Sequence, residues 1–337
     1  VVAIASERPV LQTTFAVESD EIKELSPGQA IIINKNGHLS LNQIIPEKRY
    51  AACSFERIYF SRGNDRDIYR ERKMLGLQLR DSILKSIDND IEHTVFSYIP
   101  NTAEVAYYGM LEGMRTLSPN VRSEKIVSKD IKLRTFITES GTRNDMAAHV
   151  YDITTGVVEP GVDNLVVIDD SIVRGTTLRE SIIKILDRLH PKRIVIVSSA
   201  PQIRYPDFYG IDMSRIGDFI AFQACVALIK ERGMEKLLEE VYEECKAELE
   251  KPLELMQNPV RRLYEPFSVE ELNEKMISIL RPDGVTTPID IVYQSIEGLH
   301  QAIPNHPGDW YFSGHYPTPG GMRMINSAYI DYYNRSL

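Results

Sequence analysis

The hydrophobic pattern of the chain changes character near residue 50. Before that point, apolar residues come in short β-like runs, and Asn36-Gly37 between two of them is typical of a hairpin turn. Residues 20–25 predict no more than one helical turn. Few large apolar side chains are present, so we expect this segment to make a poor core by itself. The runs predict strands at residues 1–6, 30–34 and 38–41.

After residue 50, apolar runs of strand length alternate with longer amphipathic stretches. This alternation predicts an α/β fold, in which helices cover both faces of a parallel sheet. Residues 129–161 are polar and lack periodicity, which predicts a functional flexible loop. The predicted strands are residues 55–60, 94–99, 125–128, 165–168 and 193–199, and the predicted helices are residues 68–87, 104–114 and 178–189.

Helical patterns dominate after residue 213. We expect residues 304–321, which are rich in Pro and Gly, to form a loop. The expected helices are residues 218–232, 234–251, 269–280, 292–302 and 322–333.

The stretch from Leu165 to Thr177 combines the features of a sugar-phosphate site. Its apolar first half predicts a buried strand, and Asp169 and Asp170 follow where the strand ends. A polar turn with Gly175 then leads into a helix, whose N–H groups and positive dipole end favour a phosphate. Helix capping alone would need only one acidic residue. Two adjacent carboxylates therefore indicate binding, in which they accept hydrogen bonds from ribose hydroxyls.

Composition excludes several classes of function. The chain has 337 residues, of which 43% are hydrophobic and 26% charged, as in globular proteins. It has no apolar run long enough for a bilayer and no signal-peptide pattern, so we expect no membrane partner. The net charge of −9 argues against a nucleic-acid partner. Three scattered cysteines (Cys53, Cys225 and Cys245) favour a reducing compartment without disulfides, so we expect a cytoplasmic protein.

The run Asp169-Asp-Ser-Ile-Val-Arg-Gly-Thr-Thr177 resembles the phosphoribosyl pyrophosphate (PRPP) loop of type I phosphoribosyltransferases. Its full length is similar to the version found in amidophosphoribosyltransferases, also called glutamine PRPP amidotransferases. Further segments resemble the same family in the same order along the chain. They are residues 2–7, 25–34, 53–62, 134–137, 199–213 and 311–318.

The resemblance implies a division of the chain into three parts. Residues 51–245 would form the phosphoribosyltransferase domain, a type I parallel sheet flanked by helices. Residues 1–50 would be a small β remnant of the family's Ntn-hydrolase glutaminase domain. Residues 246–337 would form a mostly helical C-terminal extension.

The resemblance also implies an enzymatic activity, that of a glycosyltransferase. Ammonia would displace pyrophosphate from C1 of PRPP and give 5-phosphoribosylamine, the first step of de novo purine synthesis. In the full-length family members this ammonia comes from glutamine. The other implied partners are purine nucleotides as feedback ligands and further copies of the chain in a homo-oligomer.

Site residues are carried over from the family by position. Mg²⁺ is the implied cofactor, with Thr102, Asp169 and Asp170 as its ligands, and Arg134 joins the acidic pair as a catalytic residue. Without the resemblance, Asn101 or Thr102 would be interpreted as a helix N-cap. The implied PRPP-binding residues are Asn101, Thr102, Lys129, Asp169, Asp170, Ser171, Ile172, Val173, Arg174, Gly175, Thr176 and Thr177.

Three features depart from the family pattern. The family's glutaminase uses an N-terminal cysteine, whereas this chain starts with Val1, so we expect most of that domain to be absent and glutamine not to be hydrolysed. Some members hold an iron–sulfur cluster with four cysteines, but only Cys53 matches a ligand position, so we expect no cluster. Basic residues are sparse in the flexible loop, where Lys129, Arg134 and Arg143 are the candidates for pyrophosphate contact.

Two further interpretations remain open. A non-catalytic regulator that binds PRPP would keep the phosphate loop while its flexible loop no longer closes. A purine or pyrimidine salvage transferase would share the loop, but the matches outside the loop are to the amidotransferase.

Overall fold

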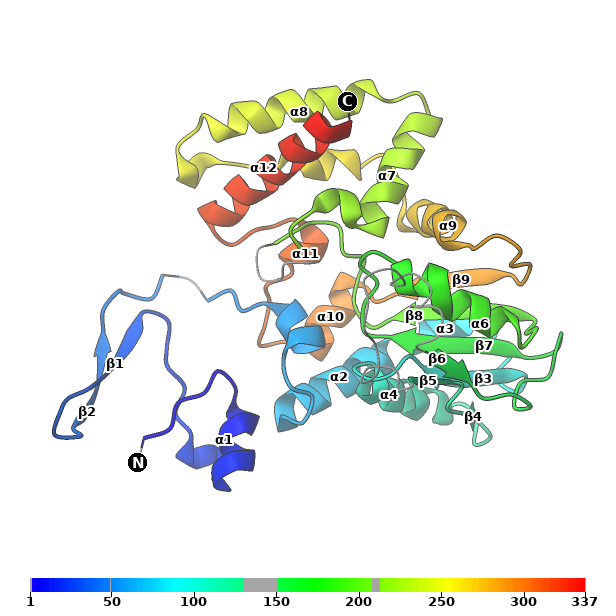
Figure 1. Cartoon of the computed structure of the whole chain (residues 1–337), viewed down its shortest axis with the longest axis horizontal. Coiled ribbons are helices and arrows are strands. Elements are labelled where there is room, and N and C mark those ends of the chain that lie inside the picture. The colour runs from blue at the N-terminus through cyan, green and yellow to red at the C-terminus, as the bar shows by residue number, and fades with distance from the viewer. Residues whose placement is uncertain (1, 49, 130–150, 208–212, 337) are drawn as a thin grey trace, which may run out of the picture.

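A five-stranded parallel sheet forms the centre of the structure (Figure 1). The computed structural model describes residues 2–48, 50–129, 151–207 and 213–336. The expected α/β fold is confirmed, because helices flank this sheet. In spatial order the strands are β4 Arg122–Ser123, β3 Thr94–Tyr98, β7 Asn164–Asp169, β8 Arg193–Ser198 and β9 Ile289–Tyr293.

Side chains from the two faces of the sheet enter two separate hydrophobic cores. In β7, Leu165 and Val167 join one core, while Val166 and Ile168 join the other. Burial on both faces explains why the central strands are continuous apolar runs. Helices α7 Ile220–Glu231 and α9 Val269–Leu280 contribute to the first core, and helices α3 Arg80–Ser86 and α4 Glu104–Arg115 contribute to the second.

A pair of helices lies beyond α7 at the top of the view in Figure 1. Helix α8 Lys236–Leu249 packs against α12 Pro319–Ser336, and the rings of Tyr242 and Tyr333 stack there with centroids 4.3 Å apart. The remaining helices include α2 Arg66–Gln78, α6 Ile183–Asp187, α10 Ile296–Ala302 and α11 Trp310–Ser313. Within the described residues, no helix has the length and apolar character needed to cross a bilayer.

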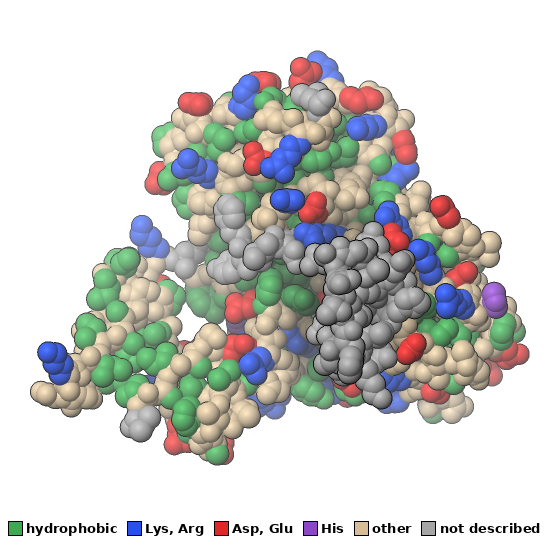
Figure 2. Space-filling model, viewed as in Figure 1, with side chains coloured by type: hydrophobic (Ala, Val, Ile, Leu, Met, Phe, Trp, Pro, Cys, Tyr) green, Lys and Arg blue, Asp and Glu red, His purple; other side chains and the backbone are tan. Residues whose placement is uncertain are grey.

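The N-terminal segment projects from the rest of the molecule (Figure 1). It contains α1 Arg8–Phe15 and a hairpin of β1 Gln29–Ile33 and β2 Leu39–Gln43, whose turn includes Gly37 at φ +78°. The hairpin prediction is confirmed. The strand predicted at residues 1–6 is wrong, because residues 2–5 pair with no strand among the described residues and helix α1 starts at Arg8, with Pro9 in its first turn. Figure 2 shows apolar side chains gathered on this segment, in keeping with the expected poor core.

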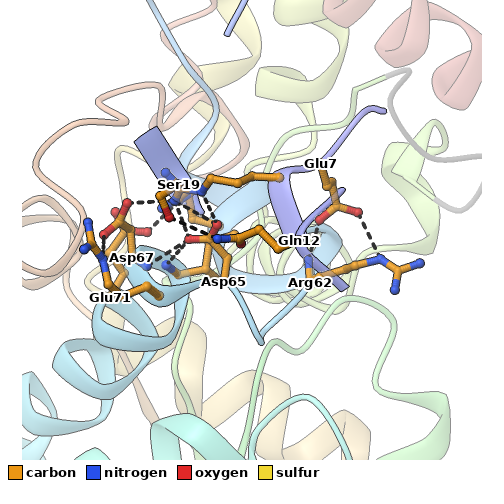
Figure 3. Close-up of polar contacts among 11 residues, drawn as sticks. Glu7, Gln12, Ser19, Arg62, Asp65, Asp67 and Glu71 are labelled. Carbon is orange, nitrogen blue, oxygen red and sulfur yellow. Dashed lines mark hydrogen bonds and ion pairs between the residues drawn. The ribbon is translucent and has the colours of Figure 1, made fainter. Parts of the chain in front are cut away.

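One cluster of ionic contacts holds the N-terminal segment against the start of α2 (Figure 3). The Arg8 guanidinium donates to both carboxylate oxygens of Asp65 and to Asp67, each at 2.8 Å. Asp65 is buried and also caps α2 by accepting from the N–H groups of Asp67 and Ile68. Glu7 accepts from the backbone N–H of Arg62 at 2.6 Å.

Replacing Asp65 with alanine is expected to lower the free energy of unfolding by about 1–2 kcal/mol, since a helix cap and the partner of Arg8 are lost together. Urea denaturation of the Asp65→Ala variant measures this. Asp81→Ala serves as the control, because Asp81 is exposed and pairs only with its neighbour Arg80. Equal midpoints for the two variants would contradict the proposed role of Asp65.

Residues 55–60 form a helical segment, so the strand predicted there is wrong. Glu56–Phe60 is a π-helical turn. Phe55 and Ile58 both enter the core, which is the spacing of a helix face and not of a strand. Aromatic and β-branched residues give the run its strand-like composition.

Three other sequence predictions need correction. Residues 125–128 do not form a strand of the central sheet, because β5 Val127–Lys129 pairs with β6 Tyr151–Ile153 in a separate sheet. The helix predicted at 292–302 starts only at Ile296, because Ile289–Tyr293 is strand β9. The loop at 304–321 contains α11. Residue 245 lies inside α8, and residues on both sides of it share one core. The division of the chain into three parts stays a prediction.

Candidate active site

Strand β7 delivers the acidic pair to the carboxyl edge of the sheet. Asp169 is the last residue of the strand, and Asp170 follows it. The end of β8 fixes their backbone, because Ser199 donates its N–H to the Asp169 carbonyl and its hydroxyl to the Asp170 carbonyl, each at 3.0 Å. Ligands of open α/β sheets bind outside this edge. Both carboxylates therefore lie where a small-molecule site is expected.

The two carboxylates share a poorly solvated environment. Burial and the adjacent Asp170 raise the pKa of Asp169 well above its usual range. Burial raises the pKa of Asp170 to about 6, although hydroxyl donors on Ser171 and Thr102 and the positive charge of Arg72 lower it. Each ionised carboxylate makes ionisation of the other more costly. A bound cation or hydrogen-bond donor at this point would relieve the cost.

The loop after the acidic pair leads directly into a helix that begins at Thr176. Among the described residues, the backbone N–H groups of Gly175, Thr176 and Thr177 have no protein acceptor. Gly175 takes φ +69°, and a Cβ on it would lie 2.2 Å from the Leu280 side chain. The predicted phosphate loop thus presents open N–H groups at a helix N-terminus, and its glycine is required by backbone conformation and by packing.

A second loop approaches the acidic pair from the end of β3. The Pro100–Asn101 peptide is cis, and the Thr102 hydroxyl hydrogen-bonds to the Asp170 carboxylate. Neither Asn101 nor Thr102 caps the following helix through its side chain, since α4 starts after Ala103 without a side-chain cap. The helix-cap interpretation of these two residues is therefore wrong, and the Thr102 hydroxyl lies beside the Asp170 carboxylate.

The predicted basic residues are placed less closely. Lys129 ends β5 and holds its ammonium 5.8 Å from the centre of the Tyr151 ring. It does not line the cavity described below. Arg134 and Arg143 lie outside the described residues, as does most of the predicted flexible loop at 129–161.

A cavity of about 870 Å³ connects the acidic pair with the phosphate loop. Residues 169–178 form one side of it. Phe55, Tyr59, Phe60 and Met213 complete the lining, and sequence reasoning did not assign any of them to the site. A cavity with carboxylates, open N–H groups and aromatic rings can hold a phosphorylated sugar and exclude water from part of it.

Comparison with known proteins adds independent information. No protein-family model matches the chain. The amidophosphoribosyltransferase of Pseudomonas aeruginosa is 33% identical over 205 residues, which are 59% of this chain and 39% of that protein. The Escherichia coli amidophosphoribosyltransferase is 31% identical over 223 residues, 65% of this chain and 42% of that protein. The Saccharomyces cerevisiae amidophosphoribosyltransferase is 30% identical over 258 residues, 73% and 48% respectively.

A solved structure that matches this chain is also a PRPP amidotransferase. The glutamine PRPP amidotransferase of B. subtilis, complexed with ADP and GMP, matches with a TM-score of 0.58 and 25% identity, covering 88% of this chain and 53% of that one. The chain is related to the amidophosphoribosyltransferases. It spans less than half the length of the three curated relatives.

In some members of the family, cysteines at several positions hold an iron–sulfur cluster. The matching segments of this chain, around Cys53, Asp207 and Trp310, lie close together. Cys53 forms a β-bridge with Gly308, and the Trp310 indole N–H donates to the Asp207 carboxylate. Burial raises the pKa of the Cys53 thiol to about 12. The other positions hold Asp207 and Trp310, where a cluster would need further cysteine thiolates. The described residues at these positions do not fit an iron–sulfur cluster.

Proposed function

We propose that the chain transfers a phosphoribosyl group from PRPP to ammonia, giving 5-phosphoribosylamine and pyrophosphate. One observation carries the proposal: the acidic pair and the open phosphate loop line the same cavity at the carboxyl edge of the sheet. The relation to amidophosphoribosyltransferases supports the same reaction.

Each side of the cavity would hold one part of PRPP. The open N–H groups and hydroxyls of the phosphate loop would bind the 5′-phosphate, and Asp169 and Asp170 would accept hydrogen bonds from the ribose hydroxyls. Asn101 and Thr102 would lie toward the pyrophosphate. Lys129 and Arg134 would contact it from the flexible loop. The proposed phosphate-loop residues are Ser171, Ile172, Val173, Arg174, Gly175, Thr176 and Thr177.

The donor set at the acidic pair fits Mg²⁺. Two carboxylates with raised pKa values and the Thr102 hydroxyl offer only oxygen ligands, which this cation prefers. Among the described residues, no group of three or more His, Cys, Asp or Glu could hold a metal ion. Asp169, Asp170 and Thr102 would therefore share the ion with water and substrate oxygens. When bound, Mg²⁺ would neutralise the pyrophosphate.

The proposed chemistry needs positioning and charge stabilisation but no protein nucleophile. The nitrogen lone pair of ammonia forms the new C1–N bond, and the C1–O bond to pyrophosphate breaks with its electron pair leaving on pyrophosphate. The nitrogen then loses one proton to solvent. Positive charge develops on the ribose ring, where the carboxylates of Asp169 and Asp170 would stabilise it.

Regulation and assembly follow the family only as proposals. The B. subtilis relative was solved as a complex with ADP and GMP. We propose purine nucleotides as feedback ligands and a homo-oligomer as the assembled state. The ammonia would come from glutamine when a glutaminase accompanies this chain.

Pyrophosphate release from PRPP, Mg²⁺ and ammonium tests the proposal. We expect release that depends on all three components and saturates with PRPP. PRPP binding measured by calorimetry, with release no faster than in protein-free buffer, would favour the non-catalytic regulator instead. Absence of both binding and release would contradict both functions.

Binding of Mg²⁺ and PRPP is expected to weaken in acid. The pKa of Asp170 near 6 means that its carboxylate is ionised above this pH and protonated below it. Because a proton competes with the cation for the carboxylate, the apparent affinity should be about tenfold lower at pH 5 than at pH 7. Isothermal titration across this range measures the change, and an affinity independent of pH would contradict the assignment.

A further inference from the structure

Three aromatic residues, Phe55, Tyr59 and Phe60, form a wall on one side of the cavity, which we call the aromatic wall. Their rings contact each other, with centroids 5.3 Å apart for Phe55 and Phe60 and 5.4 Å apart for Tyr59 and Phe60. Phe55 is buried, but Tyr59 and Phe60 are 47% and 41% exposed. Because both outer rings are partly exposed, the backbone that carries them contributes to their positions.

That backbone is held by the guanidinium of Arg72. Arg72 extends from α2 and is 5% exposed. Its Nε donates to the carbonyl of Arg57 at 2.9 Å, and its Nη2 donates to the carbonyls of Ser61 at 2.7 Å and Tyr59 at 3.4 Å. These carbonyls belong to the π-helical turn and to the residue that follows it. A helical segment ends with carbonyls that lack intrahelical partners, and Arg72 supplies donors to them.

Arg72 is an unusual residue to bury. It forms no salt bridge with any described residue, and its largest electrostatic interaction is with Asp170 at the acidic pair. A buried cation without a paired carboxylate costs free energy. A neutral donor could satisfy single carbonyls at lower cost. The planar fork of arginine is suited to spanning several fixed acceptors.

The chain remains confined where it leaves the aromatic wall. A Cβ on Gly63 would lie 2.8 Å from Nη1 of Arg72, so the backbone passes close against the guanidinium. On the other side, Glu7 accepts from the N–H of Arg62, the residue next to Ser61 (Figure 3). Arg72 and Glu7 therefore both hydrogen-bond to the backbone of this segment. Arg72 makes more of these hydrogen bonds than Glu7 does.

We propose that Arg72 is a positioning residue, whose guanidinium holds the aromatic wall over the reacting centre so that ammonia reacts there in preference to water. This inference rests on the proposed function. The same cleavage of the C1–O bond can be completed by water, with a new C1–O bond and loss of a proton giving ribose 5-phosphate and pyrophosphate. Apolar rings that exclude water favour the C1–N bond.

The test is the ratio of the two products in variants of the full chain. In Arg72→Gln and Arg72→Lys we expect kcat for ammonia to fall about tenfold and the share of ribose 5-phosphate to rise at least about fivefold, since neither side chain spans all the carbonyls. The KM for PRPP should stay within about twofold in Arg72→Lys, which leaves the phosphate loop untouched and keeps a positive charge near Asp170. Chromatography of radiolabelled products immediately after rapid quenching gives the ratio, because 5-phosphoribosylamine is a glycosylamine that hydrolyses to ribose 5-phosphate on standing.

The matched control is Arg193→Gln. Arg193 also donates to a backbone carbonyl, that of Ser86, and it pairs with Asp88 and Asp290 away from the cavity. We expect its product ratio to equal that of the unsubstituted chain. Thermal midpoints of all variants show whether each is folded at the assay temperature.

The outcomes are distinct. A folded Arg72→Gln variant with an unchanged product ratio would overturn the inference, as would an equal change in Arg193→Gln. Restoration of the ratio by Arg72→Lys would show that charge matters and that the hold on the carbonyls does not, which also overturns it. An unsubstituted chain that forms neither product would refute the proposed function instead. If Arg72→Gln does not fold, Arg72→Lys and Phe60→Ala decide, since Phe60→Ala removes an outer ring and should raise hydrolysis in the same way.

Discussion

Replacing Asp169 with asparagine is expected to lower kcat/KM for PRPP by about a hundredfold or more, as is typical when a transition-state charge loses its stabilising group. Asparagine keeps the shape and its amide oxygen, but it removes the negative charge that would hold Mg²⁺ and face the developing positive charge of the ribose. The Asp170→Asn variant should show a similar loss of kcat/KM. Ser171, Arg72 and Thr102 all lower the pKa of Asp170 and so favour its negatively charged form, which asparagine cannot provide. Initial rates of pyrophosphate release at saturating ammonium measure both.

These variants should remain folded. Neutralising one carboxylate removes repulsion within the pair, so the free energy of unfolding without ligands should not fall. Asp283→Asn is the control, because Asp283 is exposed in a loop after α9. Removal of a group that stabilises transition-state charge typically costs far more than about threefold in rate. If turnover in Asp169→Asn stays within about threefold of that of the original chain, the acidic pair is not at the reacting centre.

The second large effect is expected at Gly175. Alanine there would take φ +69° and place its Cβ 2.2 Å from a methyl carbon of the buried Leu280 side chain, so the loop or that side chain must move. Strain of about 1–3 kcal/mol accompanies such a backbone conformation in residues other than glycine. Because the displaced N–H groups are those proposed to bind the 5′-phosphate, PRPP affinity should fall more than about tenfold, the equivalent of 1.4 kcal/mol.

Gly233→Ala is the control that separates backbone strain from displacement of the phosphate loop. Gly233 has φ +64°, but no atom lies within 4 Å of a Cβ built on it. This control should lose stability through strain and keep PRPP affinity, as measured by denaturation and calorimetry. An affinity equal in Gly175→Ala and the original chain would contradict the proposed phosphate site.

The centre of the fold was predictable because local and tertiary preferences agree there. Residues 165–168 are apolar and buried on both faces, and the acidic pair and Gly175 follow immediately. The helix at α9 was predicted with its observed bounds, and in the structure Ser268 and Glu271 form a capping box at its start. The residues that form each of these features lie within a few positions of one another, so they can be found in the sequence without the three-dimensional structure.

Other elements depend on partners that are distant in sequence. Residues 55–60 look like a strand, but Arg72 supplies the donors that a helical end requires there. Strand β9 is a short apolar run whose length suits a strand or a helix start, and only its pairing with β8 decides between them. The aromatic wall and Arg72 escaped sequence reasoning for the same reason, since nothing local places them beside Asp170.

Detection of the new C1–N bond tests the proposed transfer to ammonia without a coupled assay. PRPP labelled with ¹³C at C1 is mixed with [¹⁵N]ammonium, Mg²⁺ and the chain, and the ¹³C spectrum is recorded. We expect a C1 resonance split by directly bonded ¹⁵N, which is absent when Asp169→Asn replaces the original chain. A spectrum that shows only unreacted PRPP or ribose 5-phosphate would contradict it.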